Sequence, residues 1–172
     1  MIIGIGGYRG VGKSSVVSFM TGFVHVDEKL LRKKLYSYEN DGYRQIYNYF
    51  GEEFFTSKGV LKEKKLENFI GKDFLKMRIL NNIIDPLLIN EAQKEIDRVG
   101  RERNIVIEAD NIQKYQSLLD FMIWVDAPVL CEYAKQQKYL FSHCAKFKLI
   151  LSNDFDLKKL ERVFIKEFEK YQ

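Results

Sequence analysis

One glycine-rich segment constrains the fold of this chain more than any other feature. The run GYRGVGKS, from Gly7 to Ser14, satisfies the pattern G-x-x-x-x-G-K-[ST]. It follows a short apolar run at residues 2–6, typical of a buried strand, and leads into residues 14–21, which have the character of a helix. In that context the glycines let successive backbone N–H groups point inward, and the helix directs its positive end to the same place. The sequence therefore predicts a loop that binds the phosphates of a nucleotide.

Two side chains of this loop have defined expected roles. Lys13 is expected to reach the β- and γ-phosphates of ATP and to act in catalysis, and the Ser14 hydroxyl is expected to ligate Mg²⁺. ATP and Mg²⁺ are thus the cofactors that the motif predicts. The expected ATP contacts from the loop and its flank are Tyr8, Arg9, Gly10, Val11, Gly12, Lys13, Ser14 and Ser15.

Composition and charge favour a folded protein that handles small anionic molecules. The chain has 172 residues, of which 46% are hydrophobic and 30% charged, which suits one folded domain with a substantial core. A net charge of +4 is too small to indicate a nucleic-acid partner, but it is compatible with an anionic metabolite. The two cysteines, Cys131 and Cys144, form no disulfide framework and indicate a reducing compartment.

The chain carries no pattern of a membrane or secreted protein. Residues 1–7 have no cationic segment ahead of their apolar residues, so we expect no signal peptide. No apolar run approaches the ~20 residues that a membrane-spanning helix needs. We expect a soluble, cytoplasmic monomer with neither a membrane nor a nucleic-acid partner.

Strand and helix patterns alternate along the chain. The closing segment places apolar residues three or four positions apart, which predicts an amphipathic helix that packs on the sheet; they are Leu157, Leu160, Phe164, Phe168 and Tyr171. Strands separated by helices favour a three-layer α/β/α fold with a five-stranded, mostly parallel sheet. The predicted strands are residues 2–6, 23–26, 104–108, 121–125 and, with a weaker pattern, 147–151.

A long helical insertion follows the second strand. Breaks are expected at residues 39–42, at 56–59 and at Asp85-Pro86, where Asp85 would cap a new helix that begins at Pro86. The insertion is a candidate for substrate binding. We expect a single domain over 1–172 with a core of 1–29 and 101–172, a substrate-binding insertion of 30–100 and a short lid of 130–146.

The loop alone does not define the reaction. Residues 97–100 (DRVG) fit D-x-x-G, but they lie at the expected end of a helix, where Gly100 suits a C-cap, and the guanine-reading pattern N-K-x-D is absent. These features argue against a GTPase. The small size, the early position of the loop and the helical insertion favour a kinase for a small metabolite.

Several short motifs occur in a fixed order along the chain. They are residues 1–15, FGEEF at 50–54, IVIE at 105–108, VDAP at 125–128 and ILSN at 150–153. In this order they resemble the dephospho-coenzyme A kinase family. That resemblance implies a P-loop kinase fold and transfer of the ATP γ-phosphoryl group, with Mg²⁺, to the ribose 3′-hydroxyl of dephospho-coenzyme A, the last step of coenzyme A biosynthesis. It also implies that Asn153, which ends the last match, contacts the nucleotide.

The acidic residues of the family are altered here. When Lys29 and Arg32 are aligned with the family's Lys and Arg, the two positions of its Asp-x-Asp pair correspond to Val26 and Glu28. When the alignment is shifted by one residue, Asp27 takes the first position of the pair. Asp27 is then the expected general base, with a helix N-cap as the alternative role. Glu108 takes the place of the family's aspartate after the third strand. We expect it to hold Mg²⁺ through water or to orient substrate, with a purely structural role as the alternative.

The lid is the largest departure. Residues 130–146 contain Lys135, Lys138 and Lys146 but no arginine, and lysine lacks the bidentate fork of arginine. We expect Lys138 to contact ATP in place of the family's lid arginine, or Arg9 of the loop to supply that positive charge. Two other functions stay open from the residues alone: a nucleoside or deoxynucleoside monophosphate kinase, and a nucleotide-binding protein that has lost phosphoryl transfer.

Two further features have two interpretations each. The aromatic residues of the insertion either form a small helical core or provide a stacking wall for the acceptor. His25 alternates with apolar neighbours and is expected to be a packed or edge histidine. The aromatic residues concerned are Tyr36, Tyr38, Tyr43, Tyr47, Tyr49, Phe50, Phe54 and Phe55.

Overall fold

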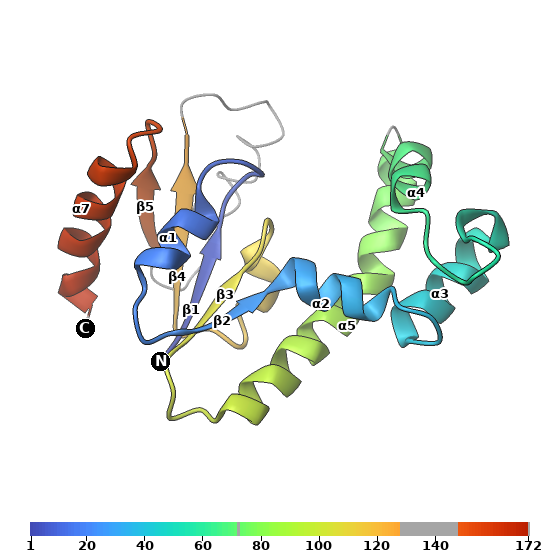
Figure 1. Cartoon of the computed structure of the whole chain (residues 1–172), viewed down its shortest axis with the longest axis horizontal. Coiled ribbons are helices and arrows are strands. Elements are labelled where there is room, and N and C mark those ends of the chain that lie inside the picture. Colours follow the sequence, from blue (N-terminus) through green and yellow to red (C-terminus); the bar gives the residue numbers. More distant parts are fainter. Residues whose placement is uncertain (72, 128–147, 172) are drawn as a thin grey trace. The chain divides into compact units, whose positions relative to one another are not determined.

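A five-stranded parallel sheet places the glycine-rich loop at its centre. The computed structural model describes residues 1–71, 73–127 and 148–171. The strand order is β2-β3-β1-β4-β5 and every adjacent pair is parallel, which confirms the predicted α/β class (Figure 1). Because β1 lies between β3 and β4, the loop that follows it emerges from the middle of the sheet. The strands are β1 (Ile2–Gly6), β2 (Val24–Asp27), β3 (Ile105–Glu108), β4 (Phe121–Asp126) and β5 (Lys148–Ser152).

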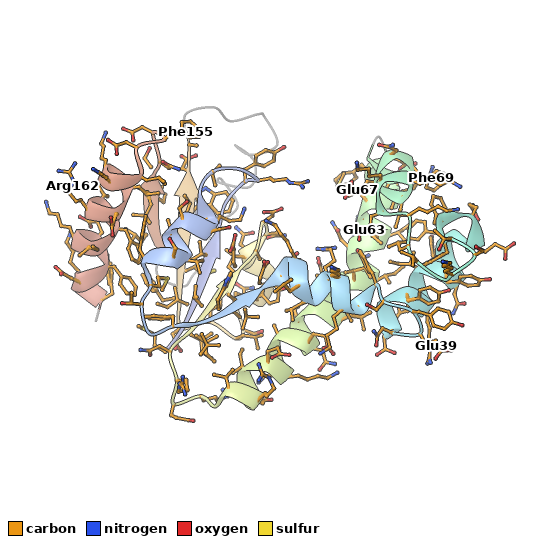
Figure 2. All side chains as sticks on the ribbon, viewed as in Figure 1. Glu39, Glu63, Glu67, Phe69, Phe155 and Arg162 are labelled. Atoms are coloured by element: carbon orange, nitrogen blue, oxygen red, sulfur yellow. The ribbon has the colours of Figure 1, made fainter. Side chains whose placement is uncertain are left out.

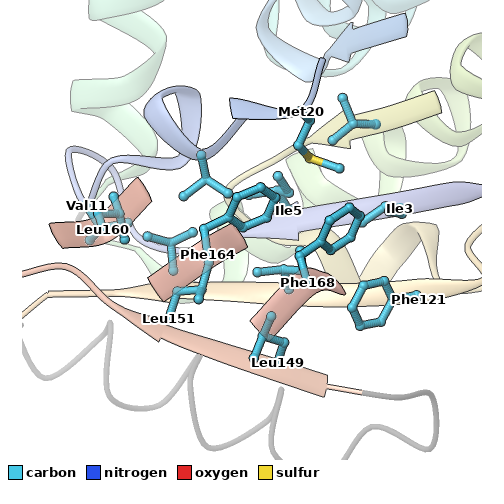
Figure 3. Packing of buried hydrophobic residues seen from close by; sticks show 14 of the residues in the cluster. Ile3, Ile5, Val11, Met20, Phe121, Leu149, Leu151, Leu160, Phe164 and Phe168 are labelled. Carbon is cyan, nitrogen blue, oxygen red and sulfur yellow. The ribbon is translucent and has the colours of Figure 1, made fainter. Parts of the chain in front are cut away.

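One face of the sheet is covered by two helices, α1 (Lys13–Phe19) and α7 (Leu157–Phe168). Alternate residues of β1, Ile3 and Ile5, point to this face and are fully buried there. The rings of Phe164 and Phe168 in α7 stack with centroids 5.0 Å apart above the strands (Figure 3). Leu160, Phe164 and Phe168 of the predicted stripe therefore form the side of α7 that packs on the sheet, and Tyr171 packs against the same cluster. Leu157 does not belong to that side, since it is 56% exposed.

The opposite face of β1 carries glycines because another segment packs directly against it. A Cβ atom on Gly4 would lie 2.4 Å from Leu119 Cδ1, and one on Gly6 would lie 2.4 Å from Ile112 Cγ2. Ile112 belongs to the short 3-10 helix η2 (Ile112–Tyr115), which follows β3. The glycines of β1 therefore allow η2 and the residues after it to approach the backbone of the central strand.

The chain folds as two compact units. The core unit comprises residues 1–27 and 95–172, and the helical unit comprises residues 28–94. The chain enters the helical unit directly after β2 and leaves it within α5. The helical unit contains α2 (Glu28–Leu35), α3 (Asp41–Phe50), η1 (Glu52–Phe54), α4 (Glu63–Ile70) and most of α5 (Phe74–Val99).

Aromatic side chains form a core within the helical unit. The Tyr43 ring lies 5.2 Å from that of Tyr38 and 4.6 Å from that of Phe55, measured between centroids. Phe54 is buried, and its ring lies 5.2 Å from that of Phe69, which projects from α4 and is largely exposed (Figure 2). Tyr36, Phe54 and Phe55 are buried, as the core interpretation requires, whereas Tyr38 and Tyr49 are 62% and 58% exposed and lie at the surface of the cluster.

The predicted helix break at Asp85-Pro86 is wrong. Helix α5 continues through Pro86 to Val99, where Gly100 ends it as expected, donating its N–H to Ile96 O at 2.9 Å. Ile84, Leu88 and Ala92 recur every four residues along α5 and are fully buried. Pro86 lies on the exposed side of the helix. Packing of the buried stripe therefore outweighs the ~3 kcal/mol that an internal proline costs a helix.

Across residues 1–71, 73–127 and 148–171, no helix is both long and apolar enough to span a bilayer.

Candidate nucleotide-binding site

The glycine-rich loop has a backbone shape that its glycines make possible. Gly10 and Gly12 have φ angles of +87° and +99°, in the left-handed region that side chains with a Cβ disfavour. A Cβ on Gly10 would meet nothing within 4 Å, whereas one on Gly12 would lie 2.5 Å from Asn153 Nδ2. Gly10 therefore keeps the loop open, and Gly12 admits a neighbouring side chain.

That neighbour, Asn153, holds the loop in place through hydrogen bonds. Its Nδ2 donates to Val11 O at 2.8 Å, and its Oδ1 accepts from the Phe155 N–H at 2.9 Å. Its own N–H donates to Asp126 O at 2.7 Å, at the end of β4. Asn153 is buried, and these bonds fix the loop to the ends of β4 and β5. A direct contact between Asn153 and ATP stays a prediction.

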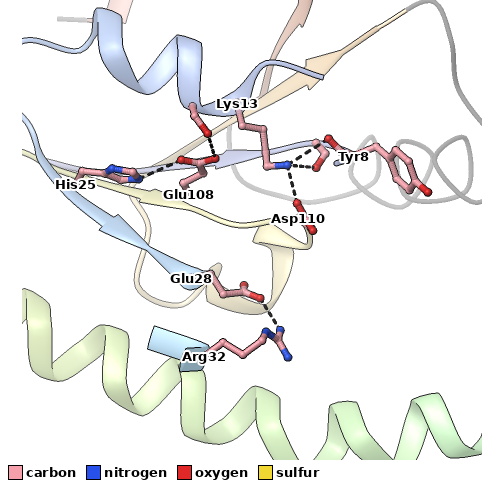
Figure 4. Close-up of polar contacts among 9 residues, drawn as sticks. Tyr8, Lys13, His25, Glu28, Arg32, Glu108 and Asp110 are labelled. Atoms are coloured by element: carbon pink, nitrogen blue, oxygen red, sulfur yellow. Dashed lines mark hydrogen bonds and ion pairs between the residues drawn. The ribbon is translucent and has the colours of Figure 1, made fainter. Parts of the chain in front are cut away.

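Lys13, the first residue of α1, folds back into the loop. Its Nζ donates to Gly7 O at 2.9 Å, to Tyr8 O at 3.2 Å and to Asp110 Oδ1 at 2.6 Å (Figure 4). An ammonium group has three hydrogens, so these bonds use all of its donors. The Lys13 side chain is 6% exposed, whereas that of Asp110 is 57% exposed.

Ser14 and His25 both donate to one buried carboxylate, that of Glu108. The Ser14 Oγ lies 2.7 Å from Glu108 Oε1, and His25 Nε2 lies 3.1 Å from Glu108 Oε2 (Figure 4). Burial raises the pKa of Glu108, but the hydrogen bonds from His25 and Ser14 and the charges of His25 and Lys13 outweigh it. The pKa of Glu108 therefore lies below its usual range. The carboxylate form is favoured at this position.

Asp27 is the last residue of β2 and pairs in register with Glu108 of β3. Both strands end at the edge from which the loop leaves β1, the edge where ligands gather in open parallel sheets. Asp27 also directly precedes α2, so the helix-cap role remains compatible with its position. Its role as the general base stays a prediction.

Of the remaining predicted contacts, Tyr8 and Arg9 are exposed and Ser15 is half-buried. Lys138, Lys135 and the rest of the expected lid lie outside the described residues.

Two residues of this site were missed by the sequence interpretation. Asp110 follows Glu108 by two residues, and the signal that could have identified it is a second acid directly after the same strand. His25 lies on the edge strand β2, in agreement with the edge interpretation, and the feature that was missed is its bond to Glu108 on the neighbouring strand. The pairing of β2 with β3, which places these two side chains together, is not visible in the sequence.

Comparisons with known proteins agree with this geometry. The family model for dephospho-CoA kinase matches residues 1–130. The chain is 34% identical to the dephospho-CoA kinase of Listeria monocytogenes over 105 residues, which are 58% of this chain and 52% of the relative. It is 28% identical to that of Mycoplasma genitalium over 134 residues, 72% of this chain and 65% of the relative. The chain thus spans about half to two thirds of the length of these curated relatives.

A solved structure extends the likeness to the whole fold. The dephospho-CoA kinase from Campylobacter jejuni superposes with a TM-score of 0.66 at 15% identity, covering 98% of this chain and 96% of that one. At this identity the superposition concerns the fold, and it confirms the three-layer α/β/α architecture. The glycine-rich loop, the strand-end acids and the family model over residues 1–130 lead to one conclusion: the chain belongs to the dephospho-CoA kinase family.

Proposed function

We propose that the protein is an ATP-dependent kinase that phosphorylates the ribose 3′-hydroxyl of dephospho-coenzyme A. The observation that carries the proposal is the placement of the Lys13 ammonium and the Ser14–Glu108 pair at the carboxyl edge of the central strand. These groups suit a polyphosphate and its cation, and the family supplies the acceptor. The location in the cytoplasm, the monomeric state and the lack of a nucleic-acid partner stay predictions.

The loop fits the phosphates of ATP. The space beside Gly10 is open, and the loop backbone around it is held in place by Asn153. Lys13 supplies a buried cation whose bonds to Gly7 O and Tyr8 O keep its ammonium group inside the loop. When ATP is bound, the positive charge of Lys13 would neutralise charge on the phosphates during transfer.

Ser14 and Glu108 are the residues that would hold Mg²⁺. Because the Ser14 hydroxyl donates its hydrogen to Glu108, its oxygen lone pairs remain available for a cation. The lowered pKa of Glu108 keeps this acceptor ionised, and hydroxyl and carboxylate oxygens are the ligands Mg²⁺ prefers. The ion, when bound, would screen the charge that develops on the transferred group.

Asp27 is the residue we assign as general base. It ends β2 in register with Glu108, at the carboxyl edge of the sheet from which the loop leaves β1. Asp27 would accept the proton of the attacking hydroxyl as its oxygen bonds to the γ-phosphorus, while the bond from that phosphorus to the β,γ-bridging oxygen breaks and ADP leaves. We assign binding of the acceptor to the helical unit, residues 28–94, which corresponds to the predicted insertion.

An ATP-consumption assay tests the proposal. The purified protein is incubated with Mg²⁺, ATP and either dephospho-coenzyme A or a panel of nucleosides and nucleoside monophosphates. We expect turnover with dephospho-coenzyme A, and its loss in Lys13→Ala while the circular dichroism spectrum is unchanged. Turnover with a nucleoside monophosphate but not with dephospho-coenzyme A would show that the acceptor is the monophosphate. ATP binding without any turnover would favour a non-catalytic nucleotide-binding protein.

A further inference from the structure

Asp110 makes the shortest of the three bonds to the Lys13 ammonium. The distance from Lys13 Nζ to Asp110 Oδ1 is 2.6 Å, compared with 2.9 and 3.2 Å to the two loop carbonyls. The backbone next to Asp110 is anchored, since the Ala109 N–H donates to Ile5 O of β1 at 3.0 Å. An acid is therefore held beside the cation that the proposed function assigns to the nucleotide phosphates.

The two partners differ in their freedom to move. Lys13 is almost fully buried, and its ammonium is held by carbonyls of its own loop, whereas more than half of the Asp110 side chain is exposed. Because more than half of its side chain is exposed, the Asp110 carboxylate stays solvated when it turns away, and what it gives up is its bond to the buried ammonium. Glu108 lacks this freedom, since it is buried and accepts from Ser14 and His25.

We propose that Asp110 holds Lys13 in the empty site and competes with the nucleotide for it, so that this residue sets the affinity for ATP. The inference rests on the proposed function, because it takes the loop to be the phosphate site. Two hydrogens of the ammonium stay on the carbonyls, and the third goes either to the carboxylate or to a phosphate oxygen. The two anions also repel each other, so a bound nucleotide displaces Asp110 from Lys13.

Asp110→Asn tests this competition because it removes the charge and keeps the size of the side chain. Binding of ATP and of inorganic tripolyphosphate is measured by calorimetry, with Mg²⁺ and with EDTA. We expect both ligands to bind about tenfold more tightly to the variant, with or without Mg²⁺. Asp110→Ala, which cannot re-form a neutral bond to Lys13, should give at least the same gain.

Asp97→Asn is the matched control. Its side chain is 59% exposed and faces Arg101 at 3.9 Å, so the same charge is removed at the same exposure. Asp97 lies in α5 before β3 begins, at the edge of the sheet away from the loop. We expect its affinities to stay within twofold of the unsubstituted protein. An equal gain in Asp97→Asn would assign the effect to net charge and overturn the proposal.

The remaining outcomes separate this inference from the proposed function. Unchanged or weaker binding by Asp110→Asn in EDTA would overturn the competition and leave the proposed function intact. If Asp110→Asn binds ATP more weakly in the presence of Mg²⁺ but not in EDTA, Asp110 interacts with the bound cation. That result would also overturn the proposed competition. If neither the unsubstituted protein nor the variants bind ATP or tripolyphosphate, the loop is not a phosphate site and both proposals fail.

Discussion

At the scale of single residues, burial separates acids of the same chemistry. Glu108 is 3% exposed and shared by Ser14 and His25, Asp110 is largely exposed and bonded to Lys13, and Asp27 lies between these extremes. A buried, doubly bonded carboxylate is fixed in place, whereas an exposed one can rotate. The same edge of the sheet therefore carries one acid that is fixed in place, Glu108, and one that can turn into water, Asp110.

The role of Asp27 is tested by Asp27→Asn. If it is the base, ATP binding should persist while kcat falls by roughly 10²–10⁴, because an amide cannot take the proton. The measurement is steady-state turnover together with the nucleotide Kd. If the residue only caps α2, the variant should lose ~1 kcal/mol of unfolding free energy and keep its turnover per folded molecule.

Glu108 should make stability depend on pH. Its pKa is lowered in the folded protein, so its contribution to stability is present above the unfolded-state pKa of about 4.3 and is lost as pH falls through the lower folded-state pKa. Glu108→Gln should reduce the unfolding free energy at pH 7 by about 1–3 kcal/mol. Urea unfolding from pH 7 to pH 3 should show the two proteins converging on the acid side; a constant difference would argue against this origin.

At the scale of helices and strands, the sequence predicted the elements that depend only on the local pattern of residues. The strands and the glycine loop follow from short apolar runs and glycine spacing, and the structure has each strand within about two residues of its expected place. Pro86 shows the limit of local pattern, because proline normally begins a helix while here a buried stripe carries α5 through it. The same limit hid the pairing of His25 with Glu108, which depends on strand order rather than on either segment.

Pro86→Ala should stabilise the protein. Proline removes the N–H that would bond to Asn82 O in the preceding turn, at ~3 kcal/mol, although it also restricts the unfolded chain by ~1 kcal/mol. We therefore expect the unfolding free energy to rise by about 2 kcal/mol in a urea titration. Asn81→Ala, an exposed position in the same helix, is the control and should gain under ~1 kcal/mol. A loss of stability in Pro86→Ala would show that the proline fits a bend the helix needs.

At the scale of the whole molecule, two compact units correspond to two proposed ligands. The polar contacts that join Lys13, Ser14, His25, Glu108 and Asp110 fall within the core unit, and the aromatic cluster falls within the helical unit. This arrangement fits the proposed division of labour, in which ATP is assigned to the core unit and the acceptor to the helical unit.

Hydrogen exchange can map this division. MgATP should slow amide exchange at residues 7–15 and 105–110, because the phosphates order the loop and the strand end. Dephospho-coenzyme A should slow exchange within residues 28–94. Adenosine, which lacks phosphates, is the control for the loop. Protection by dephospho-coenzyme A confined to the core unit would remove the helical unit from acceptor binding.

The bond from Asn153 to Val11 joins residues 142 positions apart. A ribosome that adds about 5–20 residues per second needs roughly 7–28 seconds to synthesise that interval. During that time residues 7–14 have already been synthesised, but the hydrogen bond from Asn153 that holds the loop backbone at Val11 cannot yet form. The loop would then acquire its affinity for nucleotide late in synthesis, once β5 has joined the sheet. A nascent chain that does not yet include Asn153 would not bind ATP.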